Sequence, residues 1–102
     1  MSAFLIADVS PADMQAYRNS GYLEAVPKIA AEYGGVYRAR GGRAEVLAGA
    51  WHPKRLVVIE FPSWDQLQAF YHCEAYAPYR DIRQRLTESH IVALEGTDAT
   101  PK

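Results

Sequence analysis

The chain has 102 residues, of which 49% are hydrophobic, and its 11 basic and 12 acidic side chains give a formal net charge of −1. This length predicts one domain, which we place at residues 1–96 with a flexible tail at residues 97–102, and the apolar content excludes a disordered chain. The balanced charge argues against binding to nucleic acid or to a membrane surface. The single cysteine excludes an intrachain disulfide and a multi-cysteine metal site.

The N-terminal segment contains a short apolar run, AFLIADV at residues 3–9, which predicts a buried central strand. It lacks the basic region and the cleavage site of a signal peptide, and no stretch of the chain approaches the roughly 20 apolar residues of a membrane span. We therefore expect a cytoplasmic protein. Ser10 and Pro11 follow the run in the pattern of a helix cap and a first helical residue.

Apolar residues then recur at helical spacing as far as Tyr33. Ser20-Gly21 and Pro27 interrupt this pattern, which predicts one kinked helix or two short helices. Gly34-Gly35 is expected to end the helical region, with one glycine in the left-handed conformation.

Strand-like segments follow at residues 35–40, 44–49 and 55–61. Gly41-Gly42 lies between the first two and predicts a hairpin or a bulge. Residues 55–61, RLVVIEF, form the clearest strand pattern in the chain.

The last third of the sequence predicts a broken helix and a final strand. Ser63 and Gln66 have the spacing of a capping box, which predicts a helix from there to about His72. Pro78 is expected to interrupt and restart the helical pattern, which continues to Ser89. Residues 90–96, HIVALEG, are the last predicted strand.

The resulting order is βαββαβ with a small extra hairpin, which predicts the ferredoxin-like α+β fold. This fold has a four-stranded antiparallel sheet with its helices on one face, and we expect the first and third strands to be parallel neighbours at its centre. Both faces of these strands carry apolar residues, while helices can cover only one face. We therefore predict a homodimer in which a second copy covers the other sheet face.

Several motifs give the chain a family resemblance that covers residues 4–96. The motifs are Tyr33-Gly34-Gly35, Pro53-x-Arg55, Glu60-Phe61-Pro62-Ser63, Tyr71…Glu74-x-Tyr76 and Arg83. With these motifs the chain resembles the domain-of-unknown-function family 1330, within the dimeric α+β barrel superfamily. The resemblance implies a ferredoxin-like subunit and a dimer, but no established reaction, metal or cofactor, and kinship with cofactor-independent enzymes of the same fold is only an analogy.

The adjacent His72 and Cys73 look at first like a thiol with its base. Neighbouring helical residues point about 100° apart, and a position late in a helix opposes a thiolate, so we interpret Cys73 as a packed or capping residue. The three histidines have no helical metal-ligand spacing, and we predict no metal site. His52 is kept as a candidate pocket residue because it lies beside Pro53 and Arg55.

Two carboxylates, Asp8 and Glu60, each follow two alternate apolar residues on a central strand. Parallel strands would bring them together, and two nearby carboxylates can separate their pKa values and act as acid and base. The alternative is that each carboxylate pairs with an arginine or caps a backbone group. We keep Glu60 as a candidate general base, with His52 as a second candidate catalytic residue.

The final set of candidates is rich in tyrosine and arginine. Tyr76 and Arg83 recur at helical spacing with Tyr79 and Arg80, so they share one helix side. Tyrosine hydroxyls and guanidinium groups around a cleft would suit a small anionic or aromatic ligand, whereas the alternatives are a helix-to-sheet junction or a dimer interface. The predicted ligand-binding residues are Tyr17, Arg55, Tyr71, Tyr76 and Arg83.

Three functional hypotheses follow. The first is a cofactor-independent enzyme acting on a small organic acid or aromatic compound in a pocket between helices and sheet. The second is a non-catalytic dimer that binds a metabolite in the same pocket, and the third is a structural dimer without a ligand. An enzyme would need a titratable group within hydrogen-bond reach of its substrate, so the position of Glu60 separates the first two.

Overall fold

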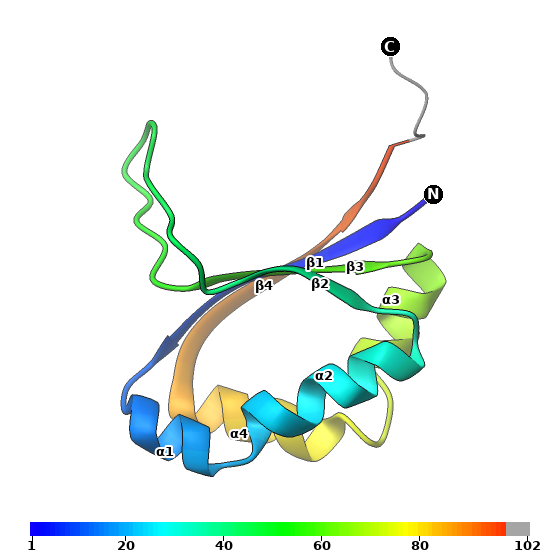
Figure 1. The fold of residues 1–102 in the computed structure, drawn as a ribbon, viewed down its shortest axis with the longest axis horizontal. Helices are drawn as coiled ribbons and strands as arrows, with labels where there is room; N and C mark the ends of the chain where they lie inside the picture. Colours follow the sequence, from blue (N-terminus) through cyan, green and yellow to red (C-terminus); the bar gives the residue numbers. More distant parts are fainter. Residues whose placement is uncertain (98–102) are drawn as a thin grey trace.

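The computed structural model describes residues 1–97, so the predicted tail lies, apart from Thr97, outside the described residues. The strands form one antiparallel sheet in the order β2-β3-β1-β4. Figure 1 shows the helices on one side of this sheet, so the predicted α+β fold with a single helical layer is confirmed. The elements in chain order are β1 (Ala3–Pro11), α1 (Met14–Asn19), α2 (Tyr22–Glu32), β2 (Val36–Arg40), β3 (Leu56–Phe61), α3 (Trp64–Tyr71), α4 (Ala77–Leu86) and β4 (Thr87–Glu95).

The two central strands, β1 and β3, are antiparallel neighbours, so the predicted parallel pairing is wrong. Phe4 pairs with Glu60, and Asp8 pairs with Leu56. The helical crossover makes β1 and β2 parallel but leaves a gap of one strand between them. Because β3 turns back from β2 to fill that gap, it must run antiparallel to both of its neighbours.

The first helical region consists of two helices, α1 and α2, separated at Ser20-Gly21 as the sequence indicated. Pro27 lies inside α2 without ending it. The predicted cap at Ser10 is wrong. The N-cap of α1 is Asp13, whose carboxylate accepts hydrogen bonds from the backbone N–H groups of Gln15 and Ala16.

The segment between β2 and β3, residues 41–55, contains no strand, so the strand predicted at residues 44–49 is wrong. We call this segment the arm. It rises from the sheet on the side opposite the helices (Figure 1), and two of its large apolar side chains, Leu47 and Trp51, are exposed. Because no neighbouring strand pairs with residues 44–49 in the described chain, their β-type side chains are not enough to form a strand.

The second half of the chain follows the predicted pattern with one shifted boundary. Ser63 caps α3 by accepting a hydrogen bond from the Gln66 N–H at 3.1 Å, as the capping box predicted. The helix α4 ends at Leu86, and residues 87–89 belong to β4 because they pair with residues 9–11 of β1. The helical prediction as far as Ser89 is therefore three residues too long.

The core lies between the helices and one face of the sheet, which we call the helix face. Alternate residues of β1 and β3 are buried there, and Phe61 stacks on Phe70, which stacks on Tyr76, with ring centroids 5.3 and 4.8 Å apart. Gly35 passes so close to the Phe61 ring that a Cβ atom would lie 2.8 Å from it. None of the helices formed by residues 1–97 has the length and apolar character needed to cross a membrane.

The opposite sheet face, which we call the open face, is not covered by any helix of residues 1–97. Phe4, Ile6 and Val58 are half-buried at its centre, while Val92 and Leu94 of β4 are 58% and 54% exposed. The two faces are therefore both apolar, as the sequence indicated, but only one of them is enclosed within the chain.

Candidate functional site

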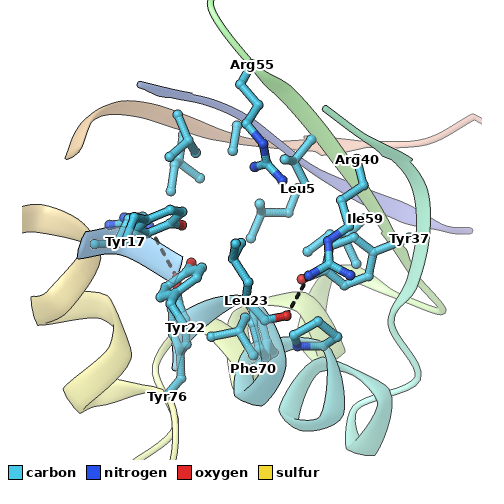
Figure 2. Close-up of a pocket in the computed structure, with 17 residues that line it drawn as sticks. Leu5, Tyr17, Tyr22, Leu23, Tyr37, Arg40, Arg55, Ile59, Phe70 and Tyr76 are labelled. Carbon is cyan, nitrogen blue, oxygen red and sulfur yellow. Dashed lines mark hydrogen bonds between the residues drawn. The ribbon is translucent and has the colours of Figure 1, made fainter. Parts of the chain in front are cut away.

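A cavity lies between the helices and the helix face of the sheet (Figure 2). It has a volume of about 40 Å³. A single water needs roughly 10–15 Å³ by the same measure, so the cavity holds more than one small group. Aliphatic and aromatic carbon forms most of its wall, and every polar side chain in the lining is a tyrosine or an arginine: Tyr17, Tyr22, Tyr37, Tyr76, Arg40, Arg55 and Arg83.

Arg83 is the most unusual of these residues, because its charged side chain is only 3% exposed. It points from the buried side of α4 and donates hydrogen bonds from Nη1 to the Tyr76 hydroxyl (3.3 Å) and from Nη2 to the Tyr71 hydroxyl (3.1 Å). Its third donor, Nε, is the one buried side-chain nitrogen or oxygen within residues 1–97 that has no partner.

No carboxylate forms an ion pair with Arg83 in the described part of the chain, where the ion pairs are Arg38–Glu60 and Glu88–His90. Burial by itself would lower the pKa of Arg83. The hydrogen bond to Tyr71 and the nearby Tyr76 oppose this effect and raise the pKa above its ordinary value. The cavity therefore contains a permanent positive charge that no acidic side chain among the described residues neutralises.

The tyrosines form a connected group beside this charge. The hydroxyls of Tyr22 and Tyr76 lie 2.8 Å apart in a hydrogen bond, and the rings of Tyr17 and Tyr22 are 5.2 Å apart. Burial raises the pKa of Tyr17 to about 12 and also raises the pKa values of Tyr22 and Tyr76. Near neutral pH these hydroxyls keep their protons, so they act as hydrogen-bond donors and not as bases.

Two further arginines lie on the sheet side of the cavity. Arg40 donates from Nη2 to the Leu23 carbonyl (2.6 Å), and its guanidinium lies 5.0 Å from the centroid of the Tyr37 ring. Arg55 lies at the end of the arm, and Figure 2 shows its guanidinium directed towards Leu5. Both arginines therefore add positive charge to the cavity from its sheet side, where Tyr37 also lies.

The position of Arg55 depends on its neighbours in the chain. Asp8 Oδ1 accepts hydrogen bonds from the backbone N–H groups of Lys54 (2.9 Å) and Arg55 (3.2 Å), and Arg55 also pairs through its carbonyl with the Val9 N–H. A Cβ atom on Gly41, whose φ is +69°, would lie 2.7 Å from Arg55 Nε. Glycine at this position leaves room for the arginine side chain to turn towards the cavity.

Four of the five predicted ligand-binding residues, Tyr17, Arg55, Tyr76 and Arg83, line this one cavity. Tyr71 does not line it, but its hydroxyl accepts a hydrogen bond from Arg83. The residues come from distant parts of the sequence, and the contacts of α1 with α4 and of α4 with β4 help to bring them together.

Glu60 lies on the open face, so the prediction that it is a base in the cavity is wrong. It forms an ion pair with Arg38 at 2.9 Å, and hydrogen bonds from Ser2 and Arg38 lower its pKa. The predicted proximity of Asp8 and Glu60 is also wrong. Because β1 and β3 are antiparallel, the two carboxylates lie four residues apart in the register, on the order of 13 Å along the strands.

His52 also lies away from the cavity. It is exposed on the arm, in a shallow surface depression that Asp8, Trp51 and His90 help to form. Within residues 1–97, no group of three or more histidine, cysteine, aspartate or glutamate side chains is arranged to hold a metal ion. The cavity residues themselves are tyrosines and arginines, which are not the ligands that common protein metals prefer.

The sequence interpretation missed three lining residues, Tyr22, Tyr37 and Arg40. A signal for Tyr22 was present, because Tyr22, Val26 and Ala30 recur every four residues and so form one side of α2. Tyr37 faces the helices because it pairs with the buried Ile59, and that register could not be read from the sequence.

Comparison with solved structures supports the same fold. The crystal structure of RPA0582, a protein of unknown function from Rhodopseudomonas palustris, matches with a TM-score of 0.72 and 17% identity, over 95% of this chain and 83% of that one. The structure of methylated RPA0582 matches with a TM-score of 0.72 and 16% identity, over 98% of this chain and 84% of that one. At these identities the likeness concerns the fold alone.

No curated protein matches the chain. The profile of one family, Domain of unknown function (DUF1330), matches residues 2–97, which is nearly the whole sequence. The protein therefore belongs to the DUF1330 family.

Proposed function

We propose that this protein binds a small organic anion in the cavity between the helices and the sheet. The observation that carries the proposal is the buried guanidinium of Arg83, which lines the cavity. Within residues 1–97 it has one donor without a partner and no carboxylate that neutralises it. A buried charge is costly unless it is paired, and a bound carboxylate would supply the missing partner through strong charge-assisted hydrogen bonds.

Binding is a better-supported role than proton abstraction. Residues 1–97 contribute no carboxylate and no imidazole to the lining, and the raised pKa values of its tyrosines keep their hydroxyls protonated at neutral pH. The cavity therefore lacks an evident general base. This argues against the version of the enzyme hypothesis that assigned this role to Glu60.

A cofactor-independent enzyme is the second candidate, and one feature favours it. Tyrosine hydroxyls and guanidinium groups surround the cavity, and such fixed donors can stabilise negative charge that develops on a reacting oxygen. Because the cavity lacks an evident general base, the proton transferred in such a reaction would have to come from the bound acid itself or be exchanged with solvent.

The test is a thermal-unfolding measurement with a panel of small carboxylates at constant ionic strength. A ligand present at 100 times its Kd stabilises the folded state by about 2.7 kcal/mol, which raises Tm by on the order of 10 °C for a domain of this size. We expect Arg83→Met to abolish the shift and Glu60→Gln, on the open face, to keep it.

If Arg83→Met does not fold, Arg55→Met is the second variant, because Arg55 is only half-buried at the wall of the cavity. This variant should weaken the shift. The proposal fails if no carboxylate stabilises the wild-type protein, or if both arginine variants respond as the wild type does.

We also propose that the protein is a homodimer in which two open faces pack together around a two-fold axis. The support is the apolar centre of that face, formed by residues such as Phe4, Ile6 and Val58, which extends to the exposed Val92 and Leu94. Soluble monomers rarely expose a continuous apolar surface of this kind. A two-fold dimer would cover it with an identical surface of the second copy.

A further inference from the structure

We propose that the anion is a short 2-oxo acid: a monocarboxylate of two to four carbons with a carbonyl group next to the carboxylate. This inference rests on the proposed function and narrows it to one chemical class. It follows from three features of the cavity: the hydrogen-bond donors that lack acceptors, the sign of the charge, and the volume.

The hydrogen-bonded pair of tyrosine hydroxyls, Tyr22 and Tyr76, has one proton more than it has acceptors. The hydroxyl of Tyr76 accepts a hydrogen bond from Arg83 Nη1 and shares another with the hydroxyl of Tyr22. If Tyr76 donates to Tyr22, the proton of Tyr22 is left over, and if Tyr22 donates, the proton of Tyr76 is left over. In either case one hydroxyl proton of the pair has no acceptor among the described side-chain hydrogen bonds.

Other donors in the lining add to this surplus. Arg83 Nε has no partner, and no side-chain hydrogen bond joins the Tyr17 hydroxyl or the Arg55 guanidinium to another of residues 1–97. The lining contains no carboxylate, amide or imidazole that could accept these protons. A ligand that fits must therefore offer several acceptor oxygens and few donors of its own.

A carboxylate and an adjacent carbonyl meet this requirement. The carboxylate suits the guanidinium of Arg83 and the spare tyrosine proton, and the carbonyl oxygen gives an acceptor to a second donor such as Tyr17 or Arg55. A 2-hydroxy acid brings its own proton, for which only tyrosine oxygens are available. A 2-amino acid brings an ammonium group, which the three cavity arginines repel.

The volume sets the upper limit on ligand size. The cavity measures about 40 Å³. An apolar cavity that binds benzene measures about 150 Å³. The space is too small for a benzoate-like ring. A three-carbon 2-oxo acid has as many non-hydrogen atoms as benzene, so it can enter only if side chains at the wall, such as the half-buried Arg55, move outwards.

The experiment is isothermal titration of the wild-type protein with acids that share one three-carbon skeleton: pyruvate, the two enantiomers of lactate, alanine and propionate, with benzoate as the larger probe. We expect pyruvate to bind at least tenfold more tightly than lactate or propionate, and we expect no binding of alanine or benzoate.

Tyr22→Phe tests the role of the spare hydroxyl proton. It keeps the ring and removes the hydroxyl, and we expect it to weaken pyruvate binding five- to tenfold while propionate binding changes less. Tyr79→Phe is the matched control, because the Tyr79 ring lies 6.5 Å from that of Tyr22 but does not line the cavity. It should bind pyruvate as the wild type does.

The outcomes separate this inference from the proposed function. Equal binding of pyruvate and propionate, or tighter binding of benzoate, would overturn the 2-oxo acid while leaving an anion site in place. Binding of alanine would do the same. If none of the acids binds, the proposed anion site fails as well.

Discussion

The two faces of the sheet are built from alternate residues of the same strands, yet they differ in burial and in how their charged side chains are paired. On the helix face, Leu5 and Ile59 are buried under helices. On the open face, their neighbours Ile6 and Val58 are only half-buried, and Val92 beside them is exposed. The contrast shows that similar apolar strands can form a core or an uncovered surface, depending on which elements the chain places over them.

The two faces also differ in whether their charged side chains are paired. The open face pairs Glu60 with Arg38, where water also reaches both side chains. The helix face buries Arg83 without an acidic partner in the part of the chain that the structure describes, although burial makes pairing more important there. An uncompensated charge on the enclosed face is therefore a stronger indication of ligand binding than a paired charge on the surface.

The largest effect that would separate the two faces is expected from removing a phenylalanine. Phe61→Ala should lower the free energy of unfolding by about 3–5 kcal/mol, because it empties a fully buried site against Phe70. Phe4→Ala, on the open face, should cost less than half as much at low protein concentration, where no second copy covers it. Urea unfolding of both variants measures the difference. Equal losses of stability would mean that the open face is as well enclosed as the helix face.

A smaller effect is expected from alkaline pH on the helix face. Burial raises the pKa of Tyr17 in the folded state to about 12, above its ordinary value near 10. The stability that the protonated Tyr17 hydroxyl gives the folded state is therefore complete below pH 10. It is lost as the pH rises towards 12, because the unfolded chain has by then released the Tyr17 proton. Two pKa units correspond to about 2–3 kcal/mol.

The measurement is urea unfolding of the wild type and Tyr17→Phe between pH 8 and pH 11.5. The wild type should lose more stability than the variant above pH 10, and the difference isolates Tyr17 from the other groups that titrate there. Parallel pH profiles for the two proteins would mean that the Tyr17 hydroxyl is not protected from water.

A charge placed on the open face is expected to have the smallest effect on the stability of the single chain. It should nevertheless strongly shift the equilibrium between dimer and monomer. Val92 is already 58% exposed, so Val92→Arg should change the stability of the single chain by no more than about 0.5 kcal/mol. In the proposed dimer it would bury two arginines near one another and favour dissociation. Sedimentation velocity at micromolar concentration should show a dimer for the wild type and a monomer for the variant.

Met14→Arg is the control, because Met14 lies on α1, away from the open face, and its side chain is also exposed to solvent. This variant should sediment as the wild type does. A wild-type protein that is monomeric at this concentration would contradict the dimer, and a dimeric Val92→Arg would place the interface elsewhere.

Local signals in the sequence predicted several elements correctly because their causes lie within a few residues. The Ser63 cap needs only the N–H of Gln66, and the helix end at Gly34, with φ of +81°, needs only a glycine that tolerates this conformation. The break between α1 and α2 likewise coincides with Ser20-Gly21. Such features could be predicted without knowing the rest of the fold.

The errors occurred where distant residues decide the outcome. Pro11 looked like the first residue of a helix, but it ends β1 because it pairs with Thr87. The same pairing draws residues 87–89 out of the helical pattern and into β4. Residues 44–49 have strand-like side chains, but they lack a neighbouring strand with which to pair. In each case a long-range pairing, or its absence, outweighed the local preference.

The candidate site divides in the same way. The fold class, the two apolar faces of the strands and the residue types that could form a pocket, tyrosine and arginine, could all be predicted from the sequence. Which of these residues meet depends on the tertiary structure. Antiparallel pairing separated Asp8 from Glu60 and left Glu60 on the open face, while the packing of helices on the other face buried Arg83 among Tyr71 and Tyr76. The reason is physical: hydrophobic alternation is a property of one strand, whereas register and burial depend on the neighbours that the whole chain supplies.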